Sequence, residues 1–167
     1  MKVVVKIGGA ALEDKSILQK CAHAVVQMAQ DGHQVAVVHG GGTALTRTLK
    51  LLGKTSDFIN GLRVTDAETR DVAVMVLAGI VNKSLVAAIA LAGQPAVGLC
   101  GGDGGAFRAR KKQDREHDLG FVGEICFSEP RWIRAIWTEG GIPIDFYSAS
   151  AADPARNSLH YLCASKS

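Results

Sequence analysis

The chain has 167 residues, of which 47% are apolar and 21% charged, and its formal net charge is +3 at pH 7. These values are typical of one globular domain, or one large lobe, with enough apolar side chains for a core. The small net charge does not indicate a nucleic-acid partner. We interpret the basic cluster at residues 108–115 as a solvated hairpin, because acids alternate with it and no aromatic side chains are interleaved.

The four cysteines have no Cys-x-x-Cys spacing, so the sequence indicates neither a zinc site nor a redox pair. We interpret them as free thiols in a reducing compartment. The apolar run Val3–Val5 is interrupted by Lys6, and we predict no signal peptide and no membrane span. These observations favour a cytoplasmic protein without a membrane partner.

The first third of the chain alternates strand and helix patterns. Lys2–Ile7 is a β-branched run, predicted to be a buried parallel strand, and it ends in Gly8-Gly9. Apolar residues at helical spacing over 17–29 predict a helix, and a second strand follows at Val35–Val38. Gly40–Gly42 then leads into a helix that reaches about Leu52. This order favours a parallel α/β sheet.

The middle of the chain contains a capping signal. Lys54–Val64 is irregular and could hold a small hairpin. Thr65-Asp66-Ala67-Glu68 fits a capping box, in which Thr65 caps a helix and Glu68 reaches back. We expect this helix to run to near Gly79, a further helix over Asn82–Ala92, and a third buried strand at Ala96–Leu99.

The remaining elements complete a predicted three-layer α/β sandwich with a mainly parallel sheet. Phe107–Lys112 and Gly120–Phe127 are expected to pair as a hairpin. Ser128 is expected to cap a helix that buries Trp132, Ile133, Ile136 and Trp137. Ile142–Tyr147 is the last predicted strand. Residues 148–167 have no clear period and could form a loop with a short helix or strand.

The glycine turns predict an anion site at the carboxyl edge of the sheet. A helix that starts directly after Gly40–Gly42 offers unpaired N–H groups and a positive dipole end to phosphate or carboxylate. Lys6 lies close to Gly8-Gly9, and a lysine in an apolar strand indicates a bound anion, or else an edge strand facing water. Arg63 precedes the capped helix and could hold a carboxylate. We interpret His39 as structural, because its imidazole can hydrogen-bond the turn.

Three motifs carry a resemblance to a known family: Lys6-Ile-Gly-Gly-Ala, Val-Val-His-Gly-Gly-Gly ending at Gly42, and Asn60-Gly-Leu-Arg-Val-Thr-Asp. Together they resemble the amino-acid kinase superfamily, whose fold is that of the carbamate kinases. The third motif, with Val81-Asn82-Lys83 and Gly102-Asp103-Gly104, is similar to the acetylglutamate kinases. The resemblance covers Met1 to about Ile144. It implies ATP-dependent phosphorylation of the side-chain carboxylate of N-acetyl-L-glutamate, a step of arginine biosynthesis.

The resemblance also implies roles for particular residues. Lys6 would stabilise the transferring phosphoryl group, and Gly8 and Gly9 would line the path of the ATP phosphates. The substrate would be bound by the backbone N–H groups of Gly41 and Gly42, with Arg63 clamping its α-carboxylate. Mg²⁺ would arrive with ATP, and no metal site of the protein itself is expected. The nucleophile is an ionised carboxylate, so no general base is needed.

The related enzymes pair through this lobe, so we expect a homodimer packed through the helix that starts at Thr65. Its excess apolar residues are Val72, Val74, Met75, Val76 and Leu77. We therefore assign residues 1–147 to an acetylglutamate-binding and dimerisation lobe.

Residues 148–167 depart from the family pattern. The family's Asn-x-Asn-Ala-Asp motif would fall on Tyr161–Ser165, which contains neither asparagine nor aspartate. We expect a divergent tail here and a missing nucleotide-binding lobe. The expectation is a kinase lobe that is incomplete for catalysis. The alternatives are a non-catalytic module that binds acetylamino acids or regulates a partner, and a dimerisation domain without a ligand.

Overall fold

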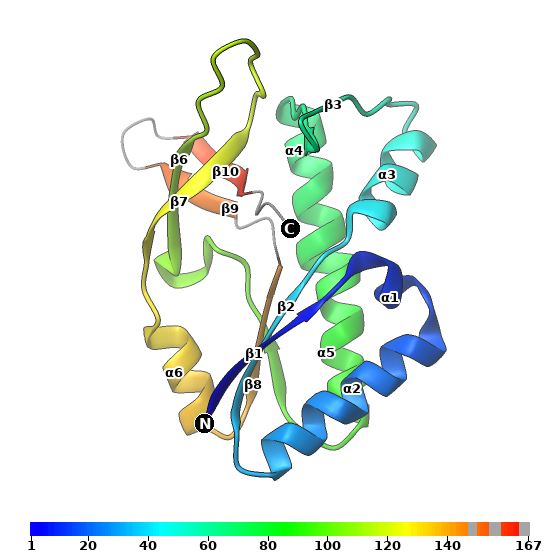
Figure 1. Ribbon diagram of the computed structural model, residues 1–167, viewed down its shortest axis with the longest axis vertical. Coiled ribbons are helices and arrows are strands. Elements are labelled where there is room, and N and C mark those ends of the chain that lie inside the picture. The colour runs from blue at the N-terminus through cyan, green and yellow to red at the C-terminus, as the bar shows by residue number, and fades with distance from the viewer. Residues whose placement is uncertain (147–149, 154–157, 164–167) are drawn as a thin grey trace.

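A computed structural model describes residues 1–146 with their side chains, and 150–153 and 158–163 as backbone. Its centre is a sheet in the order β1 (Lys2–Ile7), β2 (Gln34–His39), β8 (Ile142–Phe146) and β5 (Ala96–Gly98). Each neighbouring pair is parallel, and Figure 1 shows these strands in the middle of the molecule. The predicted mainly parallel sheet of these four segments is confirmed. Tyr147, at which the last predicted strand ends, lies outside the described residues.

Helices lie on both sides of this sheet (Figure 1). On one side are α2 (Lys15–Gln30) and α5 (Asn82–Leu91), and on the other is α6 (Arg131–Thr138), which contacts β8 and β2. The main core lies between the sheet and the first helix layer, and its buried aliphatic residues include Ile7, Val25, Val26, Val35, Val37, Leu85, Ile89, Ile142 and Ile144. The predicted three layers are therefore helix, sheet and helix.

A continuous helix of 25 residues, Ala67–Leu91, is assembled from α4 (Ala67–Val74), the π-helical η1 (Met75–Val81) and α5. The predicted end near Gly79 is wrong, because Gly79 lies inside η1. Both halves bury apolar side chains, such as Val76 and Leu85, so packing carries the helix through the glycine. By length and by its mean hydropathy of 2.1 it could span a membrane, but 44% of its most apolar stretch is buried inside the protein, which fits a core helix.

The N-terminus of this helix differs from the predicted capping box. Asp66, not Thr65, is the cap: its carboxylate accepts a hydrogen bond from Thr69 N at 2.7 Å. The Thr65 hydroxyl instead donates to the Arg63 carbonyl at 2.8 Å, and Glu68 pairs with Lys54 rather than with the cap. A carboxylate at this position also interacts favourably with the helix dipole.

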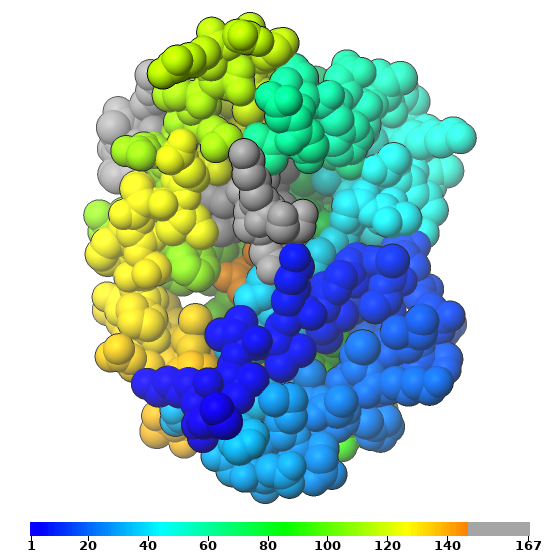
Figure 2. All heavy atoms as spheres, viewed as in Figure 1, coloured from blue at the N-terminus to red at the C-terminus, as the bar shows by residue number. Residues whose placement is uncertain are grey.

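Strand β1 is an edge strand with Lys6 exposed, which is the alternative that the sequence left open, and not the buried strand that its β-branched run predicted. Val4 is 70% exposed, whereas Ile7 is 4% exposed in the core. Figure 2 shows β1 (dark blue) crossing the front of the molecule. One reason is that β1 has a strand neighbour on one side only. Val5 and Ile7 face the core that α2 and α5 cover, whereas α6, on the side of Val4, packs mainly on β8 and β2.

Helix α6 begins differently from the prediction. Ser128 ends β7 (Val122–Ser128), and Pro130 is the cap residue of α6. None of its side chains is fully buried, and Trp132 is 42% exposed. Trp137 is partly buried, and its indole N–H donates to Val35 O at 2.8 Å. The amphipathic face was correctly located, but it lies at the border of the core.

Two smaller sheets complete the structure. The expected hairpin within 54–64 is β3 (Phe58–Ile59) with β4 (Leu62–Arg63), and β6 (Phe107–Lys111) pairs antiparallel with β7 as predicted. A short 3-10 turn, η2 (Asp103–Gly105), precedes β6. Strands β9 (Ser150–Asp153) and β10 (Ser158–Cys163) join β6 and β7 in a small barrel. Over the described residues 150–153 and 158–163 the strand alternative is the one observed, while the division of the chain at residue 147 stays a prediction.

Candidate anion-binding site

The two glycine turns lie against each other where β1 and β2 end. Gly40 N donates to Ile7 O at 2.9 Å. A Cβ atom at Gly9 would lie 2.9 Å from Gly41 N, and one at Gly40 would lie 3.0 Å from Gly9 N. Because no side chain fits between these two backbones, both turns require glycine. The two turns that the sequence placed at one sheet edge are therefore in direct contact.

The second turn opens helix α3 (Gly42–Leu51). Gly41 is its cap residue, and within the described part of the chain no side chain caps this helix. A Cβ at Gly41 would lie 2.4 Å from Leu77 Cδ2, so the long helix closes this side of the turn. A Cβ at Gly42 would meet nothing within 4 Å. The first-turn N–H groups, which have no partner within a helix, therefore belong to a turn that is open at Gly42.

Arg63 is linked to the start of α3 through a hydroxyl group. Its Nη2 donates to Thr46 Oγ1 at 2.7 Å, and Thr46 Oγ1 donates to Gly42 O at 2.8 Å. Its Nη1 donates to Ser56 Oγ. The guanidinium lies 4.6 Å from the centroid of the Phe58 ring. The structure thus brings Arg63 and Gly42, which the sequence could only name separately, into one connected group.

Arg63 has no carboxylate partner among residues 1–146, because its hydrogen bonds there go to two neutral hydroxyls. Burial lowers the pKa of the guanidinium, which nevertheless stays charged. A partly buried cation held by neutral groups retains N–H groups for an external anion. A planar fork of donors matches a carboxylate in particular.

Lys6 lies one residue from the end of β1 and is exposed. Its Cα is in register with Val38, which is in register with Asp145 of β8. Residues in register share a sheet face, so the three form a row on the side opposite the main core. Burial, with a smaller contribution from the charge of Asp103, raises the pKa of Asp145 to about 7, although the hydrogen bond from Phe146 N acts in the opposite direction.

His39 is completely buried beside the second glycine turn. Its Nδ1 lies 2.8 Å from Gly40 O, and its Nε2 lies 3.2 Å from Asn82 Nδ2. Burial lowers the pKa of the imidazole. The interpretation of His39 as a structural residue that hydrogen-bonds the turn agrees with this geometry.

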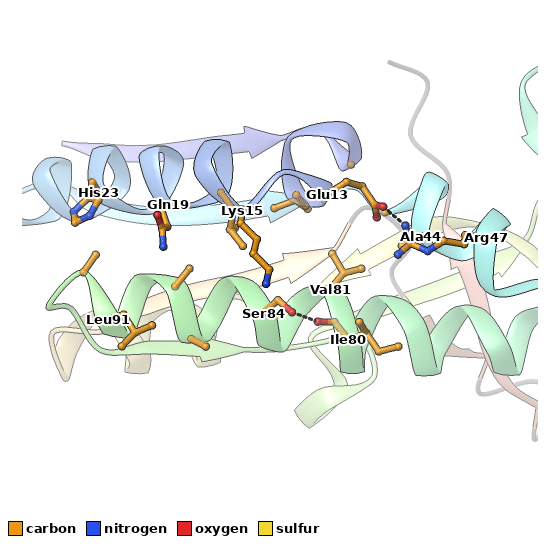
Figure 3. Close-up of a pocket in the computed structure, with 17 residues that line it drawn as sticks. Glu13, Lys15, Gln19, His23, Ala44, Arg47, Ile80, Val81, Ser84 and Leu91 are labelled. Atoms are coloured by element: carbon orange, nitrogen blue, oxygen red, sulfur yellow. Dashed lines mark hydrogen bonds and ion pairs between the residues drawn. The ribbon is translucent and has the colours of Figure 1, made fainter.

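A groove of about 740 Å³ runs between α2 and the long helix and reaches the glycine turns at one end. Figure 3 shows Lys15, Gln19 and His23 pointing from one wall toward the other, which carries Ser84 and Leu91. Of the predicted site residues, Gly9 and Gly41 line this groove. Lys6, Gly8, Gly42 and Arg63 do not.

An ion pair joins the helices that follow the two turns. Glu13, the last residue of α1 (Gly9–Glu13), pairs with Arg47 of α3, as the dashed line in Figure 3 shows. Both residues also line the groove.

The sequence reasoning missed Thr46 and Ser56, and it named Asn82 as part of a family motif without giving it a role. Hydroxyl and amide side chains at these positions carry no local signal, since their roles depend on partners far along the chain. Residues 1–146 hold no group of three or more His, Cys, Asp or Glu side chains that could bind a metal ion. Of the positions at which the resemblance placed the Asn-x-Asn-Ala-Asp motif, Tyr161–Cys163 belong to β10 and 164–165 lie outside the described residues.

Two proteins of similar sequence are both acetylglutamate kinases. The acetylglutamate kinase of Acidobacterium capsulatum is 65% identical over 144 residues, which are 86% of this chain and 55% of that protein. That of Koribacter versatilis is 55% identical over 153 residues, covering 92% of this chain and 58% of that protein. The chain therefore spans little more than half the length of these relatives.

A solved structure shares the fold. It is N-acetylglutamate synthase from Neisseria gonorrhoeae, complexed with coenzyme A and N-acetyl-glutamate. It matches with a TM-score of 0.77 and 23% identity over 96% of this chain and 36% of that one.

The parallel sheet and paired glycine turns define an α/β protein of the kind that binds ligands at the carboxyl edge of its sheet. The sequence of residues 1–144 matches the sequence model of the amino acid kinase family. The chain belongs to that family.

Proposed function

We propose that this chain is the substrate-binding lobe of an acetylglutamate kinase, an enzyme that phosphorylates N-acetyl-L-glutamate with ATP in arginine biosynthesis. The name of the two relatives, at 65% and 55% identity, supports this assignment. The observation that carries it is Arg63: its guanidinium is held by Thr46 and Ser56 and is connected to Gly42, with no carboxylate partner in the described residues.

In this proposal Arg63 holds the α-carboxylate of the substrate in a two-pronged hydrogen bond. The N–H groups of Gly41 and Gly42 bind further oxygen atoms of the same molecule. The side-chain carboxylate that attacks is ionised at neutral pH and needs no base. The buried and hydrogen-bonded state of His39 agrees with a reaction that uses no base there.

The first glycine turn fits the phosphate end of ATP. A Cβ at Gly8 would meet nothing within 4 Å, which leaves room on that side of the turn. Lys6 lies one residue before the end of β1 and supplies a positive charge close to this turn. The backbone N–H groups of Gly8 and Gly9 can bind phosphate oxygens. ATP with Mg²⁺ would supply the phosphoryl group, and these residues would neutralise its charge and align it.

We further propose that the protein is a cytoplasmic homodimer that pairs through the long helix. Of the apolar residues predicted to form the interface, Val72, Val76 and Leu77 are buried in the chain's own core, so this part of the prediction is wrong. Met75 (61% exposed), Ile80 (61%) and Leu91 (89%) remain on the outside of the helix. Ile80 and Leu91 line the groove, and together with Met75 they form an exposed apolar surface that a second copy could cover.

A second candidate is a non-catalytic module that binds acetylamino acids or regulates a partner. This candidate is favoured because the chain matches only part of each relative, 55% and 58% of their lengths. Both candidates predict the same ligand at Arg63, and they differ in phosphoryl transfer.

The proposal is tested by calorimetric titration of the chain with N-acetyl-L-glutamate. We expect Arg63→Ala to weaken binding by about 1.5–3 kcal/mol, the range for charge-assisted hydrogen bonds. Arg63→Lys keeps the charge but not the fork, so it should weaken binding less. Equal affinities of the wild type and Arg63→Ala would overturn the assignment, as would a preference for aspartate or carbamate.

A further inference from the structure

A chain of buried polar groups connects the second glycine turn to the long helix. His39 and Asn82 are both completely buried, and the structure brings them together from positions 43 residues apart. Asn82 is the first residue of α5, and Lys83 follows it. Buried polar groups must be paired, so the contacts of Asn82 determine what His39 can do.

The orientation of the Asn82 amide is determined from two directions. The Lys83 ammonium, which can only donate, lies 3.3 Å from Asn82 Oδ1. The Ile144 carbonyl, which can only accept, lies 3.3 Å from Asn82 Nδ2. Oxygen must therefore face Lys83 and nitrogen must face Ile144.

The space for this arrangement is provided by a glycine. A Cβ at Gly98 would lie 1.8 Å from Asn82 Oδ1 and 2.6 Å from Lys83 Nζ. Lys83 Nζ also donates to Gly98 O at 3.1 Å. The ammonium is thus held on the amide oxygen by a strand that leaves room for it.

The tautomer of His39 follows from the amide. Asn82 presents an N–H to His39 Nε2 at 3.2 Å, so Nε2 must accept and the ring proton must be on Nδ1. Nδ1–H then donates to Gly40 O at 2.8 Å. Burial lowers the pKa of the ring, which keeps it in this neutral form.

The Gly40 carbonyl determines where the next N–H points. In a trans peptide the C=O and N–H point in opposite directions. A carbonyl held toward His39 therefore turns the Gly41 N–H away from the ring. Gly41 N lies against the first turn, 2.9 Å from where a Cβ of Gly9 would be. A hydrogen bond to the carbonyl also polarises the peptide and strengthens its N–H as a donor.

We propose that Asn82 and His39 are positioning residues that orient the Gly40–Gly41 peptide so that the Gly41 N–H faces the bound substrate. Lys83 supports them by holding the amide of Asn82. This inference rests on the proposed function, because it takes Gly41 to be a donor to the acetylglutamate anion.

The first experiment measures the hydrogen-bond assignment without any ligand. A ¹⁵N–¹H spectrum of the wild-type chain at pH 7 should show His39 as neutral imidazole with its proton on Nδ1. Lys83→Met removes one of the two contacts that orient the Asn82 amide, so it should reduce the population of this tautomer. A proton on Nε2 in the wild type would overturn the inference. This wild-type measurement does not depend on whether any variant folds.

The second experiment compares ligand affinity with stability in the full chain. Asn places an N–H group where His carries Nδ1, so His39→Asn should bind N-acetyl-L-glutamate within about threefold of the wild type. His39→Leu removes the donor and should weaken binding about tenfold, the effect of one hydrogen bond. Ile89→Val, a buried substitution in the main core, is the matched control: it should lower the thermal midpoint without changing affinity.

The outcomes separate the two proposals. If the wild type binds acetylglutamate and His39→Leu binds it equally tightly, the positioning role is overturned and the substrate assignment stays intact. Absence of any wild-type binding to acetylglutamate would overturn the proposed function and, with it, the role of Gly41. A loss of affinity that His39→Asn fails to restore would overturn the claim that the Nδ1 donor is what matters.

Discussion

At the scale of the residue, Asp145 is a carboxylic acid in the central strand of a sheet whose adjacent positions, Ile144 and Phe146, are completely or almost completely buried. It is also the first residue beyond the stretch that matches the family. Its carboxylate accepts a hydrogen bond from Phe146 N at 2.7 Å, yet burial still raises its pKa to about 7. A group that binds its proton more tightly when folded makes stability depend on pH.

We predict that the free energy of unfolding falls as pH rises toward 8. The pKa of Asp145 is raised on folding, so its contribution is complete below about pH 4 and is lost as pH rises through about 7. Asp145→Asn removes this loss. Its stability relative to the wild type should therefore increase by about 2.6 kcal/mol between pH 5 and pH 8, at about 1.36 kcal/mol per pKa unit.

Urea unfolding at both pH values measures the difference. Asp57→Asn, at an exposed position, controls for removal of a charge as such. A difference between Asp145→Asn and the wild type that stays constant from pH 5 to pH 8 would contradict the prediction.

The glycine turns offer a second residue-scale prediction. Gly9→Ala places a Cβ 2.9 Å from Gly41 N and must push the two turns apart. We expect a loss of about 1–3 kcal/mol of stability, the usual cost of overpacking, together with weaker acetylglutamate binding. Gly8→Ala, whose Cβ meets nothing within 4 Å, is the matched control and should leave stability nearly unchanged. Chemical denaturation distinguishes them, and equal stabilities would show that the turns are not in contact.

At the scale of the element, the long helix depends on a cap that differs from the sequence prediction. Asp66 accepts from Thr69 N, so we expect Asp66→Ala to cost about 0.5–2 kcal/mol of stability. Glu68, which a capping box would make equally important, instead forms an exposed ion pair with Lys54. Glu68→Ala should therefore cost less than about 1 kcal/mol. Thermal unfolding measures the stability lost in each variant. A larger loss in Glu68→Ala than in Asp66→Ala would support the capping box instead.

The π-helical segment η1 places the long helix against the glycine turn. Leu77 of η1 occupies the space where a side chain of Gly41 would lie. The segment also leads directly into Asn82, which reaches His39. The long helix therefore contributes a wall to this turn and a buried hydrogen bond to His39 beside it.

At the scale of the whole molecule, the exposed apolar residues of the long helix predict self-association. Light scattering at micromolar concentration should give the mass of a dimer. Met75→Glu and Ile80→Glu should shift the chain to monomer, because each would bury an unpaired charge in the interface. Val4→Glu, at an equally exposed site on β1, is the control and should stay dimeric. A monomeric wild type would contradict the prediction.

Catalysis is also a property of the whole molecule. Phosphoryl transfer needs in-line positioning and cations around the transferred group. This chain matches 55% of the Acidobacterium enzyme, and the motif expected at Tyr161–Ser165 is not there. We therefore predict that the 167-residue polypeptide assayed alone turns over far below the roughly 1–100 s⁻¹ of typical kinases.

A coupled ADP-release assay with acetylglutamate, ATP and Mg²⁺ measures this, with the Acidobacterium enzyme as positive control. Turnover in the typical range, abolished by Lys6→Ala, would show instead that the chain is catalytically sufficient.

The sequence by itself determined the elements whose signal is local. Short apolar runs identified the four central strands, and the glycines after β1 and β2 identified the turns, because such patterns act over a few neighbouring residues. The motifs around Lys6, Gly42 and Arg63 were sufficient to indicate the family.

Only the tertiary structure decided how these parts meet. It made β1 an edge strand, carried the long helix through Gly79, and moved the cap from Thr65 to Asp66. It also joined Arg63 to Gly42 through Thr46, and His39 to Asn82. The physical reason is that each of these depends on burial or on a hydrogen bond between segments distant in sequence, where packing outweighs local propensity.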